Sequence, residues 1–82
     1  MDYTLSAHAK ARMRERGIRQ EDVQDAIDHS TIRSTQRDGR TLIKKVYTRE
    51  GKQRLLLIAG EHRKNIFNII TVIDTSKVNK YL

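Results

Sequence analysis

Cysteine, proline and tryptophan are absent from this chain of 82 residues, and its aromatic rings come from only three tyrosines and one phenylalanine. Without cysteine there can be no disulfide, no thiolate nucleophile and no cysteine-based zinc site, and the chain suits a reducing cytosol. The few aromatic side chains leave little material for a platform on which bases could stack. Sequence-specific reading of single strands is therefore not expected.

Long hydrophobic runs are also absent. The longest, residues 55–59, is far too short to span a bilayer, and the first residues lack a basic segment followed by an apolar one. We therefore expect no membrane segment and a cytoplasmic location. A chain of this length supplies one modest core, so residues 1–82 are expected to form a single domain.

Motifs for metals and cofactors are missing too. His8, His29 and His62 show no ligand spacing, and the acids of residues 21–28 have the spacing of an exposed helical face. The sequence has no glycine-rich phosphate loop, dinucleotide fingerprint or serine nucleophile motif. It therefore predicts neither a metal ion nor a cofactor.

Positive charge is in excess, with 17 lysines and arginines against 10 acids and a formal net charge of +7. Residues 31–82 hold twelve of the basic side chains and four of the acids. Such a balance favours a polyanionic partner, either nucleic acid or an acidic protein, over a generally solvated basic surface.

The pattern of residues 6–18 predicts one helix. Ser6 is a suitable N-cap, and Gly17 is a natural left-handed stop. At about 100° per residue, Ala9 and Met13 mark a buried stripe. The margin of this stripe carries the candidate functional side chains: His8, Arg12 and Arg16.

A second helix is predicted over residues 20–29, with Val23, Ala26 and Ile27 on its apolar face. Its other face is acidic and would repel phosphates. We therefore expect this helix to support the fold, with His29 as its C-terminal cap.

Strand patterns rich in threonine and branched apolar residues follow, at residues 31–36, 41–48, 53–59 and 66–74. Short turns are expected at residues 38–39 and 50–51, a longer polar loop at 60–65, and a basic tail with a helical turn at 76–82. The strands most simply form an antiparallel meander. The predicted fold class is α+β, with two N-terminal helices packed on a four-stranded, mainly antiparallel sheet.

Residues 6–18 spell Ser-x-His-Ala-x-x-Arg-Met-x-x-Arg-Gly-Ile, and residues 69–73 spell Ile-Ile-Thr-Val-Ile. With these motifs, most of the chain resembles small prokaryotic and phage-associated domains of unknown function that share a His-Ala-x-x-Arg-Met helix. That group is placed with the barnase, EndoU, colicin and RelE superfamily of metal-independent ribonucleases, many of which are toxins. The resemblance implies a RelE- or barnase-like fold. One departure is Arg19, where related sequences tend to carry a serine or threonine cap for the second helix.

Position by position, the resemblance implies an active cleft between helices and sheet that holds His8, Arg12 and Thr71. Metal-free RNA cleavage requires one group to take the 2′-hydroxyl proton and one to protonate the departing 5′-oxygen, with cations or donors at the phosphoryl oxygens. His8 can be the base or the acid, and Arg12 can clamp the phosphate. Thr71 can donate to a phosphoryl oxygen or a base edge.

Further candidates for binding nucleic acid are Arg16, Lys45, Tyr47 and Arg63. Structural roles stay open for all the candidates. His8 can pack at the rim of the core, the arginines of the first helix can pair with nearby acids, and Thr71 can be an ordinary strand residue. The two candidates of the second strand can equally form a solvent-facing cross-strand pair.

Two functions are consistent with these residues. The first is an endoribonuclease, as in a toxin–antitoxin-like system, with RNA as its substrate and an acidic antitoxin or immunity protein as its partner. The second is a noncatalytic basic module that docks nucleic acid or an acidic protein. His8→Ala should abolish the first function, whereas the second should depend on charge and salt.

Overall fold

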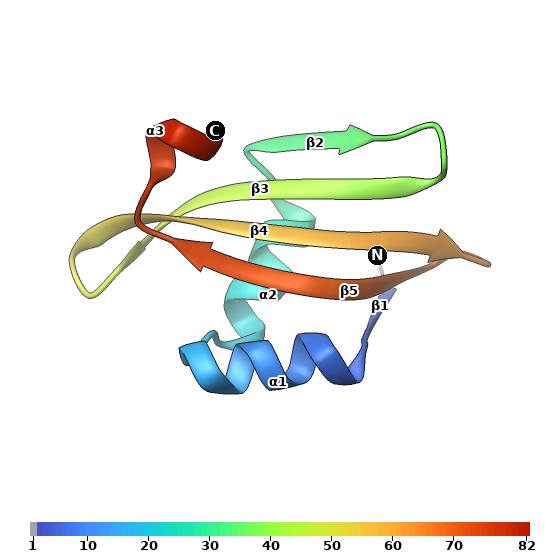
Figure 1. Cartoon of the computed structure of the whole chain (residues 1–82), viewed down its shortest axis with the longest axis horizontal. Helices are drawn as coiled ribbons and strands as arrows, with labels where there is room; N and C mark the ends of the chain where they lie inside the picture. The colour runs from blue at the N-terminus through green and yellow to red at the C-terminus, as the bar shows by residue number, and fades with distance from the viewer. Residues whose placement is uncertain (1) are drawn as a thin grey trace.

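A five-stranded sheet and two main helices make up the fold in the computed structural model, which describes residues 2–82. In chain order the elements are β1 (Asp2–Leu5), α1 (Ala7–Arg16), α2 (Gln20–Asp28), β2 (Ile32–Thr35), β3 (Arg40–Arg49), β4 (Lys52–Arg63), β5 (Ile66–Thr75) and α3 (Val78–Tyr81). Figure 1 shows α2 crossing one face of the sheet and α1 running beside β5. The predicted α+β class is therefore confirmed.

Strands β2 to β5 form the predicted antiparallel meander. The order across the sheet is β1-β5-β4-β3-β2, and β1 lies parallel to β5 with Tyr3 opposite Phe67. The prediction of a four-stranded sheet is therefore wrong by one strand. β1 has only four residues, and its partner lies at the other end of the chain, so no local turn signal marks the pairing.

β4 is longer than predicted, because residues 60–63 continue it rather than form a loop. A Cβ atom on Gly60 would come within 2.5 Å of the Asn68 carbonyl oxygen, so the close approach of β5 requires glycine here. Only Lys64 and Asn65 remain as the turn. Their φ values of 50° and 69° are those of a type I′ hairpin.

A β-bulge interrupts the pairing of β4 with β5. Thr71 is paired with Ala59, and the next pair is Ile69 with Gly60, so Ile70 is an extra residue on β5. The extra residue resets the alternation of side chains along the strand. Ile69 is fully buried against the helices, while Thr71 lies half-buried on the opposite face.

The main core lies between the helices and one face of the sheet. It contains the apolar helix residues predicted from their spacing, together with the buried residues of the central strands: Ile43, Leu56, Ile58, Phe67, Ile69 and Val72. The other side of β5 stays open, since Ile66 is 41% exposed and Ile73 is 48% exposed. The helical turn expected in the tail is α3, which lies against β4. No helix among residues 2–82 has the length and apolar character to cross a bilayer.

Both predicted ends of α1 are confirmed. Ser6 Oγ accepts from the Ala9 amide at 3.0 Å, and Gly17 adopts a left-handed φ of 64°. Arg19, at the N-cap of α2, makes no capping bond. Its guanidinium instead donates to both oxygens of Asp22 at 3.2 Å. The departure at Arg19 puts this cap in doubt at the level of sequence, and the structure has no side-chain cap there.

Candidate functional site

The start of α1 is fixed to β5 at the bulge. The Ser6 amide donates to the Ile69 carbonyl oxygen at 2.9 Å, and Ser6 Oγ donates to the Ile70 carbonyl oxygen at 2.9 Å. From this contact the helix and the strand run in the same direction (Figure 1), advancing about 1.5 Å and about 3.3 Å per residue. Two helix residues thus match about one strand residue, which places His8 level with residues 70–71 of β5. The Thr71 side chain itself lies on the face of the sheet opposite the helices, so it does not join His8 and Arg12 as the sequence predicts.

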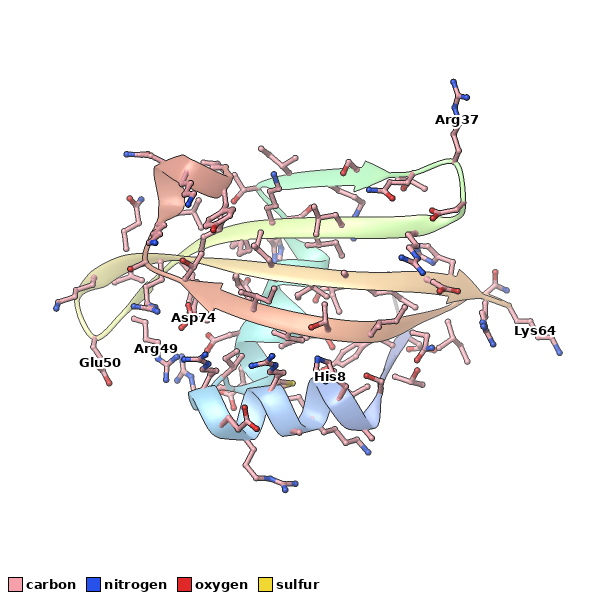
Figure 2. All side chains as sticks on the ribbon, in the orientation of Figure 1. His8, Arg37, Arg49, Glu50, Lys64 and Asp74 are labelled. Atoms are coloured by element: carbon pink, nitrogen blue, oxygen red, sulfur yellow. The ribbon has the colours of Figure 1, made fainter. Side chains whose placement is uncertain are left out.

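Three side chains of α1 form a line beside this strand. Figure 2 shows His8 directed from α1 toward β5. Arg12 and Arg16 follow it at intervals of four residues, about one turn of the helix, and both lie next to residues of β5. All three residues are exposed. Within residues 2–82, no hydrogen bond or ion pair engages the His8 ring, and Arg12 makes only a 3.9 Å ion pair with Glu15. The line is therefore available to a ligand.

A narrow groove of about 190 Å³ runs between α1 and β5, and its walls are formed by Arg12, Arg16, Val72, Ile73 and Asp74. It lies between a helix and the sheet, where the sequence predicts the active cleft. His8 and Thr71 are not among its walls. We call the line of His8, Arg12 and Arg16, together with residues 70–74 of β5, the α1–β5 seam.

A buried carboxylate stands at the end of the seam. Asp74 is 4% exposed, and its oxygens accept from three side chains: Tyr47 Oη at 3.0 Å, Arg49 Nη1 at 3.0 Å and Arg54 Nε at 2.9 Å. Burial, and then the hydrogen bond to Asp74, raises the pKa of Tyr47. The same carboxylate raises the pKa of Arg54. Tyr47 is thus held as a neutral donor and Arg54 as a cation.

A wider groove of about 410 Å³ opens over this carboxylate. Its walls carry four cationic side chains and three acids: Arg16, Arg49, Lys52, Arg54, Glu15, Glu50 and Asp74. We call it the cationic groove. Figure 2 shows Arg49 and Asp74 between the β3–β4 hairpin and the C-terminal end of α1. Because both grooves include Arg16 and Asp74, the cationic groove adjoins the α1–β5 seam.

A family model described as "Domain of unknown function (DUF4258)" matches residues 5–74. The chain belongs to the DUF4258 family. The matched residues begin at the end of β1 and extend to Asp74, so they include the whole α1–β5 seam. No curated protein and no solved structure matches the chain significantly. The predicted resemblance to domains of unknown function is therefore confirmed, and activity has to be inferred from the site itself.

The other predicted binding residues of this DUF4258 domain lie apart from the seam or are engaged within the protein. Lys45 Nζ donates to the His29 carbonyl oxygen at 2.7 Å, where a cation suits the C-terminal end of α2. Tyr47 belongs to the buried cluster. Arg63 is exposed at the β4–β5 hairpin, at the opposite end of the sheet from the cationic groove. Of the four predicted binding residues, Arg16 alone lies in the seam.

Sequence reasoning misses Arg49, Arg54 and Asp74. Asp74 is the only acid in β5 and stands among apolar residues, and an acid in such a strand signals a paired charge. Arg49 directly precedes a two-residue turn and Arg54 lies three residues after it, opposite Tyr47, so the hairpin brings both to the helix-covered face. Within residues 2–82, no group of three or more histidines and acids is placed to hold a metal ion.

Proposed function

We propose that this DUF4258 domain is a metal-independent endoribonuclease that binds RNA along the α1–β5 seam. One observation carries the proposal: His8, Arg12 and Arg16 form an exposed line beside β5. An imidazole beside guanidinium groups, on a chain with a net charge of +7, suits proton transfer at a phosphodiester. The bulge at Ile70 supports the assignment, because bulges are over-represented next to active sites.

In the proposed reaction, the 2′-oxygen attacks the adjacent phosphorus and the bond from phosphorus to the 5′-oxygen breaks. The products are a 2′,3′-cyclic phosphate and a 5′-hydroxyl. His8 takes the proton of the 2′-hydroxyl, and a solvent water molecule on the opposite side of the phosphorus protonates the departing 5′-oxygen. His8 then returns its proton to solvent. Arg12 stabilises the charge that builds on the non-bridging oxygens.

The proposal is tested by cleavage of labelled RNA in EDTA. We expect His8→Ala to lower the rate by about 10²–10⁴-fold, and Arg12→Ala to lower it as well. A strand with a 2′-deoxy nucleotide at the cleavage position should not be cut there, because it lacks the attacking oxygen.

His29→Ala is the matched control, since His29 is also exposed but lies at the C-terminal end of α2. Its rate should equal that of the wild type. Cleavage that survives His8→Ala, or that requires added metal, would contradict the proposal. Equal losses in both histidine variants would assign the effect to stability rather than to chemistry.

The second candidate function is a noncatalytic module that docks nucleic acid. The observation that favours it is the cationic groove, which adds Arg49, Lys52 and Arg54 to the arginines of the seam. In that case RNA should bind without being cleaved. His8→Ala should leave the affinity unchanged, and affinity should fall steeply with salt.

A toxin role would add a partner to the ribonuclease proposal. An acidic antitoxin or immunity protein would cover the same basic surface and compete with RNA. Expression of the wild-type chain in bacteria should then arrest growth, whereas the His8→Ala variant should not. Growth at the normal rate with both chains would count against the toxin role and leave the ribonuclease proposal to the cleavage assay.

A further inference from the structure

The cationic groove has no part in the proposed reaction. Arg16, its cationic residue nearest to His8 in the sequence, lies about 12 Å farther along the α1 axis at about 1.5 Å per residue. A phosphate beside His8 and Arg12 therefore cannot also fill the groove. The groove nevertheless has the features of an anion site of its own.

Asp74 holds the guanidinium of Arg54 in one orientation. Arg54 Nε lies 2.9 Å from both oxygens of the carboxylate. Its two Nη groups make no hydrogen bond to any other residue of the described chain, and the side chain is 28% exposed. An arginine fixed through Nε presents its remaining N–H groups as a preorganised donor pair, which suits phosphate oxygens.

Two further cations are free to join Arg54. Lys52 is exposed and lies across the hairpin from Arg49, and the exposed Arg16 borders the same groove. Arg49 contributes charge only, because its Nη1 binds Asp74 and its Nη2 donates to the carbonyl oxygens at the end of α1. Three cationic side chains with available donors thus surround one space.

The acids of the groove offset part of this charge but leave it net positive, with four cationic side chains against three acids. Asp74 is buried between two guanidinium groups, and Glu15 lies 3.9 Å from Arg12. Figure 2 shows Glu50 at the tip of the β3–β4 hairpin, pointing away from Asp74. The donors that line the open space therefore belong to cations.

We infer that the cationic groove binds a second phosphate of the RNA strand. The inference rests on the proposed function, which places the reacting phosphate beside His8. The distance of about 12 Å exceeds the separation of neighbouring phosphates in a strand, so the second phosphate lies two or more nucleotides from the reacting one. The groove recognises the phosphodiester through charge and fork geometry and reads no base.

The test measures the affinity of the full chain for two 2′-O-methyl RNAs, which cannot react: an eight-nucleotide strand and a dinucleotide. Each RNA is titrated into the wild type and into the variants. Lys52→Gln should weaken binding of the eight-nucleotide strand about five- to tenfold. The slope of log affinity against log salt concentration for this strand should fall by about 0.7. The single phosphate of a dinucleotide cannot fill both positions. Its affinity should therefore change less than about twofold.

Two more variants separate the groove from general charge and from misfolding. Arg37→Gln removes the same charge from the exposed β2–β3 turn (Figure 2) and should leave both affinities at the wild-type values. Arg54→Lys keeps the charge beside Asp74 but removes the pair of Nη donors. It should weaken binding of the longer strand only. Equal effects of Lys52→Gln and Arg37→Gln, or no effect of Lys52→Gln, would overturn the inference.

Arg12→Gln in the same titration separates this inference from the proposed function. If Arg12→Gln leaves both affinities unchanged while Lys52→Gln acts on the longer strand, RNA occupies the groove but not the seam, and the ribonuclease proposal fails alone. If only Arg12→Gln weakens binding, the groove inference fails and the seam stands. Loss of affinity in both variants, for the longer strand, supports both.

Discussion

Arg49 and Asp74 form an ion pair that joins three separate parts of the fold. Arg49 Nη1 lies 3.0 Å from Asp74 Oδ2, and its Nη2 donates to the carbonyl oxygens of Arg16 and Gly17 at 2.9 and 3.0 Å. The pair therefore ties β3 and β5 to the end of α1, where unpaired carbonyl groups and the helix dipole favour a cation. The positions of both the seam and the cationic groove depend on this connection.

Asp74→Ala should destabilise the fold, because it leaves two guanidinium groups and the Tyr47 hydroxyl without their acceptor. Removing one partner of a buried pair costs about 3–5 kcal/mol, but Arg49 and Arg54 keep 29% and 28% of their surface in water. We therefore expect a loss of about 2–3 kcal/mol in the free energy of unfolding. Urea unfolding measures it. Asp28→Ala, an exposed acid at the end of α2, should change stability by less than about 0.5 kcal/mol.

Gly17→Ala should be more harmful than Gly51→Ala. Both glycines have positive φ, 64° and 76°, so both substitutions carry the strain of a left-handed residue, about 1–2 kcal/mol. At Gly17 the added Cβ would also come within 2.8 Å of Arg49 Nη2, whereas at Gly51 it meets nothing within 4 Å. The difference between the stability losses of the two variants, measured by thermal or urea unfolding, reports the cost of displacing Arg49. Equal losses would show that Arg49 moves aside freely.

Tyr47→Phe should change how stability depends on pH. Burial, and then the bond to Asp74, raises the pKa of Tyr47 in the folded state above its ordinary value of 10.0. The folded state therefore holds the phenolic proton more tightly, and this stabilisation is complete below pH about 10 and is lost as pH rises through the folded-state pKa. Wild-type stability should fall more steeply than that of Tyr47→Phe above pH about 10. Unfolding at pH 8 to 11 tests this, and Tyr81→Phe should follow the wild type.

The parts of the fold that the sequence predicts are those with local signals. Ser6 and Gly17 bound α1 because capping acts over one helical turn. The turn at Glu50 and Gly51 joins β3 to β4, as Gly51 indicates, because glycine adopts a positive φ without steric cost. The line of His8, Arg12 and Arg16 likewise follows from helical spacing alone, so the exposed edge of the seam can be predicted.

The missing parts depend on contacts between distant segments. Strand β1 forms because Ser6 and the residues before it pair with β5. Four residues are too few for a pattern of alternating apolar and polar side chains to reveal this pairing. Arg49, Arg54 and Asp74 converge only once the register of β3, β4 and β5 is set. Gly60 resembles the start of a loop because glycine marks both turns and close strand contacts, and only the position of β5 decides between them.

Gly60→Ala should perturb the seam although Gly60 lies on β4. Its new Cβ would lie 2.5 Å from the Asn68 carbonyl oxygen and 2.8 Å from the Phe67 ring, so backbone has to move at the bulge. We expect a loss of about 1–3 kcal/mol in stability. The Ile70 carbonyl oxygen that accepts from Ser6 should shift as well, so the Ala9 amide capped by Ser6 should exchange its hydrogen faster. Amide exchange measured by NMR tests this link. Wild-type protection of the α1 amides in the variant would mean that the bulge does not position His8.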